Sequence, residues 1–304
     1  MTTPGIDIML PHYGDTSYLK TAVHSVIAQD DEDWHLTVVD DSDTDDTDLP
    51  EWFGSLDDPR VRYLSNEHNL GINANFQKCL DLAERDFLVI MGSDDAMLPN
   101  YVSTVRRATR RFPDADVVQP GVEVIDGSGR VVHPLTDRVK RGLYAPGTAP
   151  RLLDGEDLAV SLLRGNWTYF PSLCWRRAAV KDIGFRRGLS VVLDLALMLD
   201  LLKRGGQLAV VPDVCFQYRR HEGSLSSSLA CLGGRFTEEH DFFLGVAEHM
   251  DRIGWHRAAR AARLHLSSRL HALLLLPGAV TSRQAASAKA LARHAFGPTK
   301  PVRK

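Results

Sequence analysis

The chain has 304 residues, of which 44% are hydrophobic and 25% are charged, and its formal net charge is −3. This size and composition are typical of a globular protein with a full hydrophobic core, and they exclude a disordered or fibrous chain. The small net charge gives no general attraction to nucleic acid, so we expect no nucleic-acid partner.

The cysteines and the start of the chain both favour a reduced, cytoplasmic setting. The four cysteines stand singly, without the spacing of a zinc site or a disulfide framework. Residues 1–5 lack the basic and apolar segments of a signal peptide. The longest apolar run, Ala272 to Leu276, is far too short to span a bilayer.

Apolar runs alternate with helical patterns in the first third of the chain. The pattern predicts strands at residues 6–10, 36–39, 61–64 and 87–91, of which the first is buried and the last is central, with helices at 19–27 and 74–83 between them. The alternation predicts an α/β fold with a doubly wound sheet.

Two of these strands end in paired aspartates, Asp40-Asp41 and, shortly after the other run, Asp94-Asp95. Open α/β sheets bind ligands at the carboxyl edge of their strands. One acidic pair could accept hydrogen bonds from a nucleoside, while the other holds a divalent cation on a diphosphate. The pattern is typical of a nucleotide-sugar enzyme.

The middle of the chain continues the α/β pattern. We expect a helix from Pro99 to about Phe112, strand at Val117-Val118 and at residues 122–125, and a turn at 126–129. Residues 134–151 are rich in Pro, Gly and basic residues, which indicates a mobile lid. Helical patterns follow at 158–163 and 193–202, and a last strand at 208–211.

The chain beyond Ser228 is predicted to be largely helical, and its charged residues from Arg252 onward are mostly basic. Its apolar side contains Leu264, Leu266, Leu270, Leu273 and Leu274. We expect this side to pack back onto the rest of the protein. A homodimer contact, or peripheral contact with the inner face of the plasma membrane, are the alternatives.

Several short motifs, in this order, resemble those of family 2 glycosyltransferases with the GT-A fold. They are the segment Ile6 to Tyr13, Ser25 to Gln29, Val38 to Ser42, Asn69-Leu70-Gly71, Gly92 to Asp95, and Tyr218 to His221. The resemblance covers residues 5–228. It implies a mixed GT-A sheet with a nucleotide-sugar-binding half at 1–115, an acceptor-binding and catalytic-base half at 116–228, and a helical extension at 229–304.

The resemblance also implies the reaction. We expect inverting transfer of one sugar from a nucleotide-diphosphate sugar, with UDP or dTDP favoured, to a glycan, a lipid-linked or a small-molecule acceptor. Mn²⁺ or Mg²⁺ is the expected cofactor. The chain lacks a Q-x-x-R-W motif and long apolar runs, which argues against a processive synthase. A sugar-nucleotide or carbohydrate-binding protein without catalytic activity is the alternative.

The nucleotide site is carried over residue by residue. The resemblance implies that Pro11 and Tyr13 form the wall against which the nucleobase packs. It assigns Asp41 and Asn69 to the same site, with Asp41 accepting a hydrogen bond from a base N–H. The alternatives are a loop aromatic that closes the core for Tyr13, and a cap or turn former for Asp41.

The cation site follows in the same way. The resemblance implies that Asp95 is a direct metal ligand and that Asp94 faces the ribose or lies behind the ligands. Arg219 and His221 are assigned to the diphosphate and to a second metal contact. A turn after the strand, and a structural histidine, are the alternatives.

The resemblance places the catalytic base about ten residues before a Lys-Arg-Gly helix end, which is Asp194. The usual preceding Glu is replaced here by Leu193. Apolar neighbours would partly desolvate Asp194 and make it a stronger base. Asp200 is the competitor, but it lies on another helical face, so we favour Asp194.

Overall fold

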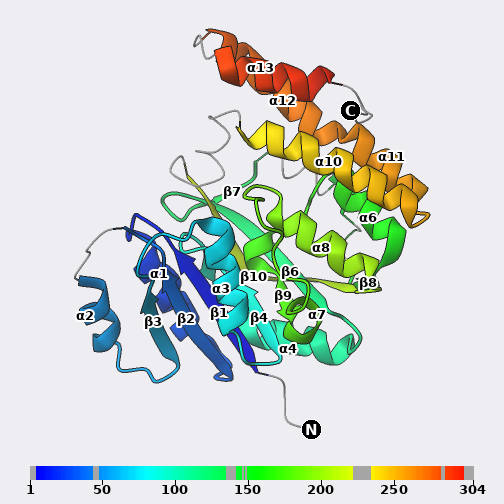
Figure 1. Cartoon of the computed structure of the whole chain (residues 1–304). Helices are drawn as coiled ribbons and strands as arrows, with labels where there is room; N and C mark the ends of the chain where they lie inside the picture. Colours follow the sequence, from blue (N-terminus) through cyan, green and yellow to red (C-terminus); the bar gives the residue numbers. More distant parts are fainter. Residues whose placement is uncertain are drawn as a thin grey trace.

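The computed structural model describes residues 5–43, 48–134, 142–145, 147, 149–221, 234–281 and 285–297. They form one twisted sheet with helices on both faces, and the helices of the C-terminal region stack above it (Figure 1). The lid predicted at 134–151 lies partly outside the described residues.

The first half of the chain alternates strands and helices as predicted. Its strands lie in the interior and its helices lie against them (Figure 1). The elements are β1 (Ile6–His12), α1 (Leu19–Ile27), β2 (Trp34–Asp40), α2 (Asp48–Ser55), β3 (Val61–Ser65), α3 (Ile72–Leu82), β4 (Phe87–Ile90), β5 (Ala96–Met97) and α4 (Tyr101–Arg111).

The second half returns to the same sheet. Its elements are β6 (Val117–Asp126), β7 (Val131–Val132), β8 (Arg151–Leu153), α6 (Gly155–Arg164), η1 (Phe170–Ser172), β9 (Cys174–Arg176), α7 (Arg177–Val180), α8 (Leu193–Lys203) and β10 (Leu208–Arg220). The helical extension consists of α10 (Gly234–Arg252), α11 (His256–Leu264), α12 (Leu266–Thr281) and α13 (Ala285–Phe296).

The strand order is β3-β2-β1-β4-β9-β6-β10-β5, with β7 beside β6 and β8 beside β10. The strands β3, β2, β1 and β4 are parallel. Because β9 is antiparallel to both β4 and β6, those two strands point the same way, and β10 is parallel to β6. The carboxyl ends of β1, β2, β3, β4, β6 and β10 therefore meet at one edge. Strands from both sides of residue 115 share this sheet.

Two apolar layers cover the sheet. On one face α1 and α4 bury side chains such as Val23, Val26 and Tyr101 against β1, β2 and β4. On the other face α3, α6 and α8 form a second layer, and Phe243 of α10 and Ala258 of α11 complete it. The central strands β1 and β4 are covered on both sides, which explains their nearly continuous apolar sequences, whereas the edge strand β3 is only partly buried.

Three elements differ from the sequence prediction. The acidic segment after Asp41 leads into α2, which was not predicted. The two strand segments predicted at 117–118 and 122–125 form one strand, β6, which runs unbroken through Pro120-Gly121. The partner strand β10 bulges opposite it, and a β-carbon on Gly121 would lie 2.5 Å from the carbonyl oxygen of Pro212. The last strand also runs nine residues further than predicted, to Arg220.

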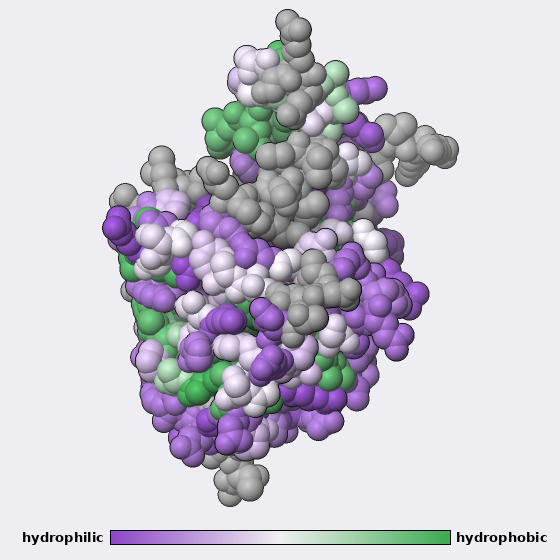
Figure 2. Space-filling view, turned by 90° about the vertical axis from the view of Figure 1, so that its left-hand side faces the viewer, coloured by the Kyte–Doolittle hydropathy of each residue, from purple (hydrophilic) through white to green (hydrophobic). Residues whose placement is uncertain are grey.

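The leucine side of the C-terminal region was predicted to pack inward, and this is wrong for α12. Leu266, Leu270 and Leu274 are 60%, 58% and 69% exposed. They recur at helical spacing on one face of α12, whereas Ala272 faces inward. Figure 2 shows apolar surface on this upper part of the molecule. Among the described helices, none is both long enough and apolar enough to cross a membrane.

Candidate functional site

Asp41 anchors the turn that begins α3. Its carboxylate accepts hydrogen bonds from the backbone N–H of Leu70 at 2.7 Å and of Gly71 at 2.9 Å, and from Nδ2 of Asn66 at 2.7 Å. Asn69 closes the same turn by donating from Nδ2 to the Asp41 carbonyl at 3.0 Å. Gly71 has φ +78°, a conformation that favours glycine. The turn-forming interpretation of Asp41 thus holds in part.

The same carboxylate, although only 3% exposed, retains the capacity to accept another hydrogen bond. Oδ1 of Asp41 takes two of the three hydrogen bonds and Oδ2 takes one, so a second lone pair of Oδ2 is left among these contacts. Contact between Asp41 and a nucleobase N–H stays a prediction.

Tyr13 lies just beyond β1, beside this turn. Its side chain is 58% exposed, so it does not close the core. The loop is tied to the end of β2 by the N–H of Gly14, which donates to Oγ of Ser42 at 2.9 Å, and by the N–H of Asp41, which donates to the carbonyl of His12. Pro11 is within β1 and half-buried. An exposed ring beside Asp41 is suitable for stacking on a base.

The second acidic pair follows β4 at the same edge, and its two carboxylates differ. Asp95 is 1% exposed, and its Oδ1 accepts the backbone N–H of Arg219 at 2.8 Å. Its Oδ2 is buried and has no hydrogen-bond partner among the described residues. Burial and the neighbouring Asp94 raise the pKa of Asp95 well above its usual value. A bound cation would offset both the cost of burying the Asp95 charge and its repulsion by Asp94.

Asp94 is more open and faces β10. Its Oδ2 lies 3.1 Å from Nε2 of His221, the residue that follows β10. A β-carbon added to Gly92 would lie 2.7 Å from Oδ1 of Asp94 and 2.8 Å from Oδ2 of Asp95, so both carboxylates crowd one point. Carboxylate oxygens with one imidazole form a donor set that fits Mn²⁺, and Mg²⁺ less well.

Arg219 holds this arrangement together from within. It is buried, and it donates from Nε to the Asp94 carbonyl at 2.7 Å and from Nη1 to the Asp126 carbonyl at 3.0 Å. Its guanidinium also lies over the ring of Tyr18, 4.5 Å from the centroid. These contacts give Arg219 a positioning role for Asp94 and Asp95. Its predicted contact with a diphosphate is untested.

Asp194 lies in the first turn of α8. Its Oδ2 accepts a hydrogen bond from Nδ2 of Asn166 at 3.1 Å. The backbone before it is fixed by Glu238 of α10, whose Oε1 accepts the N–H groups of Ser190, Val191 and Val192 at 2.9, 2.7 and 3.1 Å. A residue of the C-terminal extension therefore sets the start of the helix that carries the predicted base.

A family model described as "Glycosyl transferase family 2" matches residues 7–179, which is more than half of the chain. The chain belongs to glycosyl transferase family 2. The matched segment begins in β1 and ends in α7, so it includes Pro11, Tyr13, Asp41, Asn69, Asp94 and Asp95. The family assignment and the enzyme class expected from the motifs are confirmed.

Two curated relatives are similar over most of this chain. A protein of Mycobacterium tuberculosis, named only as uncharacterized protein MT1568, is 31% identical over 74% of this chain and 70% of its own length. Succinoglycan biosynthesis protein ExoO of Rhizobium meliloti is 25% identical over 74% of this chain and 64% of its own length. The glycosyltransferase described here thus matches less than two thirds of the second relative.

A solved structure extends the likeness to nearly the whole chain. S. aureus TarS 1–349, in complex with UDP-GlcNAc, has a TM-score of 0.59 and 15% identity, and the match covers 96% of this chain and 90% of TarS 1–349. At this identity the likeness shows the fold alone, including the helical region after the sheet. The expected α/β architecture is confirmed.

The two candidates for the base of this glycosyltransferase have different surroundings. Asp200 accepts hydrogen bonds from Nε and Nη2 of Arg186 at 2.6 and 2.5 Å and pairs with Lys203. Burial raises the pKa of Asp200, but the bonds from Arg186 and Lys203 outweigh it and hold that pKa below its usual value. A carboxylate held charged by two cations is a poor base. The preference for Asp194 over Asp200 gains support, and the role of Asp194 stays a prediction.

Sequence reasoning passed over several residues of this family 2 site. Asn66 follows β3 as Asp41 follows β2, so the rule that strand ends carry the site would have found it. Asn166, Tyr18 and Glu238 contact Asp194, Arg219 and the start of α8 from distant segments. Local sequence patterns do not predict contacts between such distant segments.

Proposed function

We propose that this family 2 enzyme transfers one sugar, with inversion, from a nucleotide-diphosphate sugar to an acceptor hydroxyl in the biosynthesis of a cell-surface glycan. The observation that carries the proposal is the convergence of two acidic sites at one sheet edge. Asp41 and Tyr13 lie at the end of β2 and β1, and Asp94 meets His221 across the ends of β4 and β10.

The two sites divide the donor between them. The exposed ring of Tyr13 and the remaining lone pair of Asp41 suit a base that offers a ring N–H, as uracil and thymine do through their imide. TarS, similar in fold, has been solved with UDP-GlcNAc. The nucleotide assigned to this chain is therefore UDP first and dTDP second.

The residues of the second site fit a divalent cation. Asp94 and His221 meet at the surface of the edge, and Asp95 adds a buried oxygen with no partner in the described part of the chain. We assign Asp94 and His221 as the first ligands, with Asp95 as ligand or support behind them; this differs from the order expected from the family motif. A bound Mn²⁺ or Mg²⁺ supplies positive charge that stabilises the departing nucleoside diphosphate.

The chain's own residues supply the remaining steps. Asp194 accepts the proton of the acceptor hydroxyl, whose oxygen forms a bond to the anomeric carbon. The bond from that carbon to the diphosphate oxygen breaks in the same step, and the nucleoside diphosphate leaves with the electron pair. One displacement inverts the anomeric centre. Asn166 orients Asp194 through the 3.1 Å hydrogen bond from its side chain.

The acceptor belongs to the same proposal. A relative named as a succinoglycan biosynthesis protein favours a growing polysaccharide or its lipid-linked precursor. The exposed leucines of α12 would suit contact with the membrane that carries such an acceptor, and a homodimer contact is the alternative use of that face.

Calorimetry with UDP, dTDP and GDP, with and without Mn²⁺, tests the donor site. We expect metal-dependent binding of UDP or dTDP that Asp94→Ala abolishes. Asp114→Asn, at an exposed aspartate outside the edge, should bind as wild type does. Nucleotide binding with the same affinity with and without Mn²⁺, or binding that Asp94→Ala leaves unchanged, would contradict the proposed cation site.

Turnover separates the enzyme from a binding protein without activity. Asp194→Asn should bind the donor as tightly as wild type and lose about 10²- to 10⁴-fold in the release of nucleoside diphosphate from the sugar nucleotide that binds. Wild-type protein that binds a donor but never releases product, with any acceptor preparation, would favour the binding protein.

A further inference from the structure

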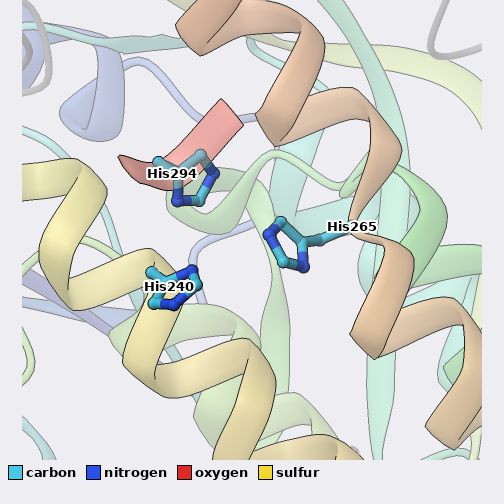
Figure 3. Close-up of side chains that lie close together, drawn as sticks. All are labelled: His240, His265 and His294. Carbon is cyan, nitrogen blue, oxygen red and sulfur yellow. The ribbon is translucent and has the colours of Figure 1, made fainter. Parts of the chain in front are cut away.

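Three buried histidines meet between the helices of the C-terminal extension. His240 lies on α10, His265 lies between α11 and α12, and His294 lies on α13, and their rings point toward one another (Figure 3). One ring nitrogen from each lies within 4.8 Å of the other two. None of them belongs to the sheet edge described above.

The tautomers of two rings follow from their neighbours. Nδ1 of His265 lies 2.9 Å from the carbonyl of Ala262, and Nδ1 of His294 lies 3.0 Å from the carbonyl of Phe236. A carbonyl only accepts, so each Nδ1 carries the proton and each Nε2 has a lone pair. Metal-binding histidines are typically oriented in this way. Burial lowers the pKa of both rings to about 4, which keeps them neutral at physiological pH.

His240 carries an unused polar atom. His240 is 4% exposed, and its buried Nδ1 makes no hydrogen bond within the described residues. Such an atom is expensive in a protein interior, and native structures rarely keep one without a ligand or water.

The contacts of Ser268 beside His294 leave one acceptor without a proton when the ring is neutral. Oγ of Ser268 contacts Nε2 of His294 at 2.7 Å and also contacts a carboxylate oxygen of Glu239. The hydroxyl has one proton, while the neutral ring and the ionised carboxylate both only accept. One of the two contacts therefore lacks a proton, and a cation would satisfy both acceptors.

The backbone at His265 is also unusual. Its φ of 28° lies in the left-handed region, which a non-glycine residue adopts at a cost. The conformation turns the buried ring toward His240 and His294 at the sharp corner between α11 and α12 (Figure 3).

We propose that His240, His265 and His294 bind a divalent transition metal, zinc by preference, with Glu239 or a water as the fourth ligand. The Oε2 of Glu239 lies 3.9 Å from Nε2 of His294. Tetrahedral zinc with nitrogen ligands at 2.0–2.1 Å needs the nitrogens about 3.4 Å apart, so the rings close in from their present separation. The ion ties α10, the corner between α11 and α12, and α13 together.

Arg269 competes with the ion. Its Nε donates to Nε2 of His265 at 3.1 Å, while Nη1 and Nη2 donate to the carbonyls of Ala295 and Gly297, both at 3.0 Å. Metal binding through Nε2 of His265 requires this guanidinium to turn away. Removal of its charge should therefore tighten the site.

Metal analysis of protein purified without a histidine tag tests the proposal, followed by zinc calorimetry after treatment with EDTA. We expect one zinc per chain and a higher melting temperature with zinc. His240→Phe keeps a ring of similar size and loses no hydrogen bond from Nδ1, so it should fold and lose the zinc. His133→Gln, at an exposed histidine, and Asp94→Ala, in the donor site, should both keep it.

Substitution with Co²⁺ reports the geometry directly. Wild-type protein should give the intense visible bands of tetrahedral cobalt, and Arg269→Met should bind cobalt more tightly. No stoichiometric zinc in wild type, together with His240→Phe more stable than the metal-free wild type, would show that the three rings only pack as core aromatics. Zinc that is lost in Asp94→Ala but kept in His240→Phe would be bound at the sheet edge that carries Asp94 instead.

Discussion

At the scale of single residues, the sheet edge that carries Asp94 and Asp95 depends on a glycine. Gly92 has no positive φ that would require glycine, yet a β-carbon there would come within 3 Å of both Asp94 and Asp95. The glycine is needed for the space it leaves to the two carboxylates. The first acidic turn depends on Gly71 for a different reason, because the φ of +78° at which its N–H donates to Asp41 favours glycine.

Gly92→Ala should therefore damage the cation site without damaging the fold. The added methyl group displaces Asp94, the more open of the two carboxylates, and we expect metal-dependent nucleotide binding to weaken about tenfold to a hundredfold. Gly54→Ala, where a β-carbon meets open space, is the matched control. Calorimetry measures the nucleotide affinity of both variants in the presence of metal. Equal affinities would mean that the methyl group at position 92 is accommodated and that the space beside Asp94 and Asp95 is not important for binding.

At the scale of elements, the C-terminal extension takes part in the site through helix α10. Its Glu238 accepts three successive backbone N–H groups just before α8, where unpaired N–H groups and the helix dipole favour a negative charge. The face of α12 that carries Leu266, Leu270 and Leu274 makes no comparable contact with the sheet, and its membrane or dimer role stays a prediction.

Glu238→Gln should lower turnover more than donor binding. The neutral amide gives weaker hydrogen bonds to the start of α8, at a cost of about 1–2 kcal/mol in stability, and Asp194 loses its fixed position. Glu248→Gln, at an exposed position of the same helix, is the control. We would measure the melting temperature, the affinity for the donor and turnover. A variant with a lower melting temperature but unchanged turnover would show that α10 supports the fold only.

At the scale of the whole molecule, the metal-free protein should lose stability in mild acid, first in its C-terminal helices. The folded pKa of His265 and His294 is about 4, below the usual 6.5, because both rings are buried. The unfolded chain therefore binds more protons between pH 6.5 and 4, and stability falls as the pH falls through that window. The loss is on the order of 3 kcal/mol per ring at most.

Hydrogen exchange in EDTA at pH 7 and pH 5 checks this. The groups around the rings are His240, Glu239 and Arg269, and Glu239 is the one that opposes the loss by favouring protonated His294. Amides of α10, α12 and α13 should lose protection at pH 5 while β1 and β4 keep theirs. A uniform loss of protection across the sheet and the helices would mean that the histidines are not the main cause of the lower stability in acid.

The sequence by itself determined the elements and the family. Continuous apolar runs predicted β1 and β4, and helical spacing predicted α1, α4, α6 and α8, because burial on two faces or on one stripe constrains every residue of such an element. Short motifs at the strand ends predicted a glycosyltransferase, since strand ends are where this kind of sheet presents polar groups.

Only the tertiary structure decided which polar groups meet. Asp94 pairs with His221 and Asp95 with Arg219 across more than one hundred residues of sequence, because β10 returns parallel to β6 at the same edge. Glu238 accepts hydrogen bonds from the backbone just before α8, and three histidines from separate segments of the C-terminal extension meet in its interior. Periodicity reports which side of an element is buried, but partners depend on how the elements cross, and that is settled by packing.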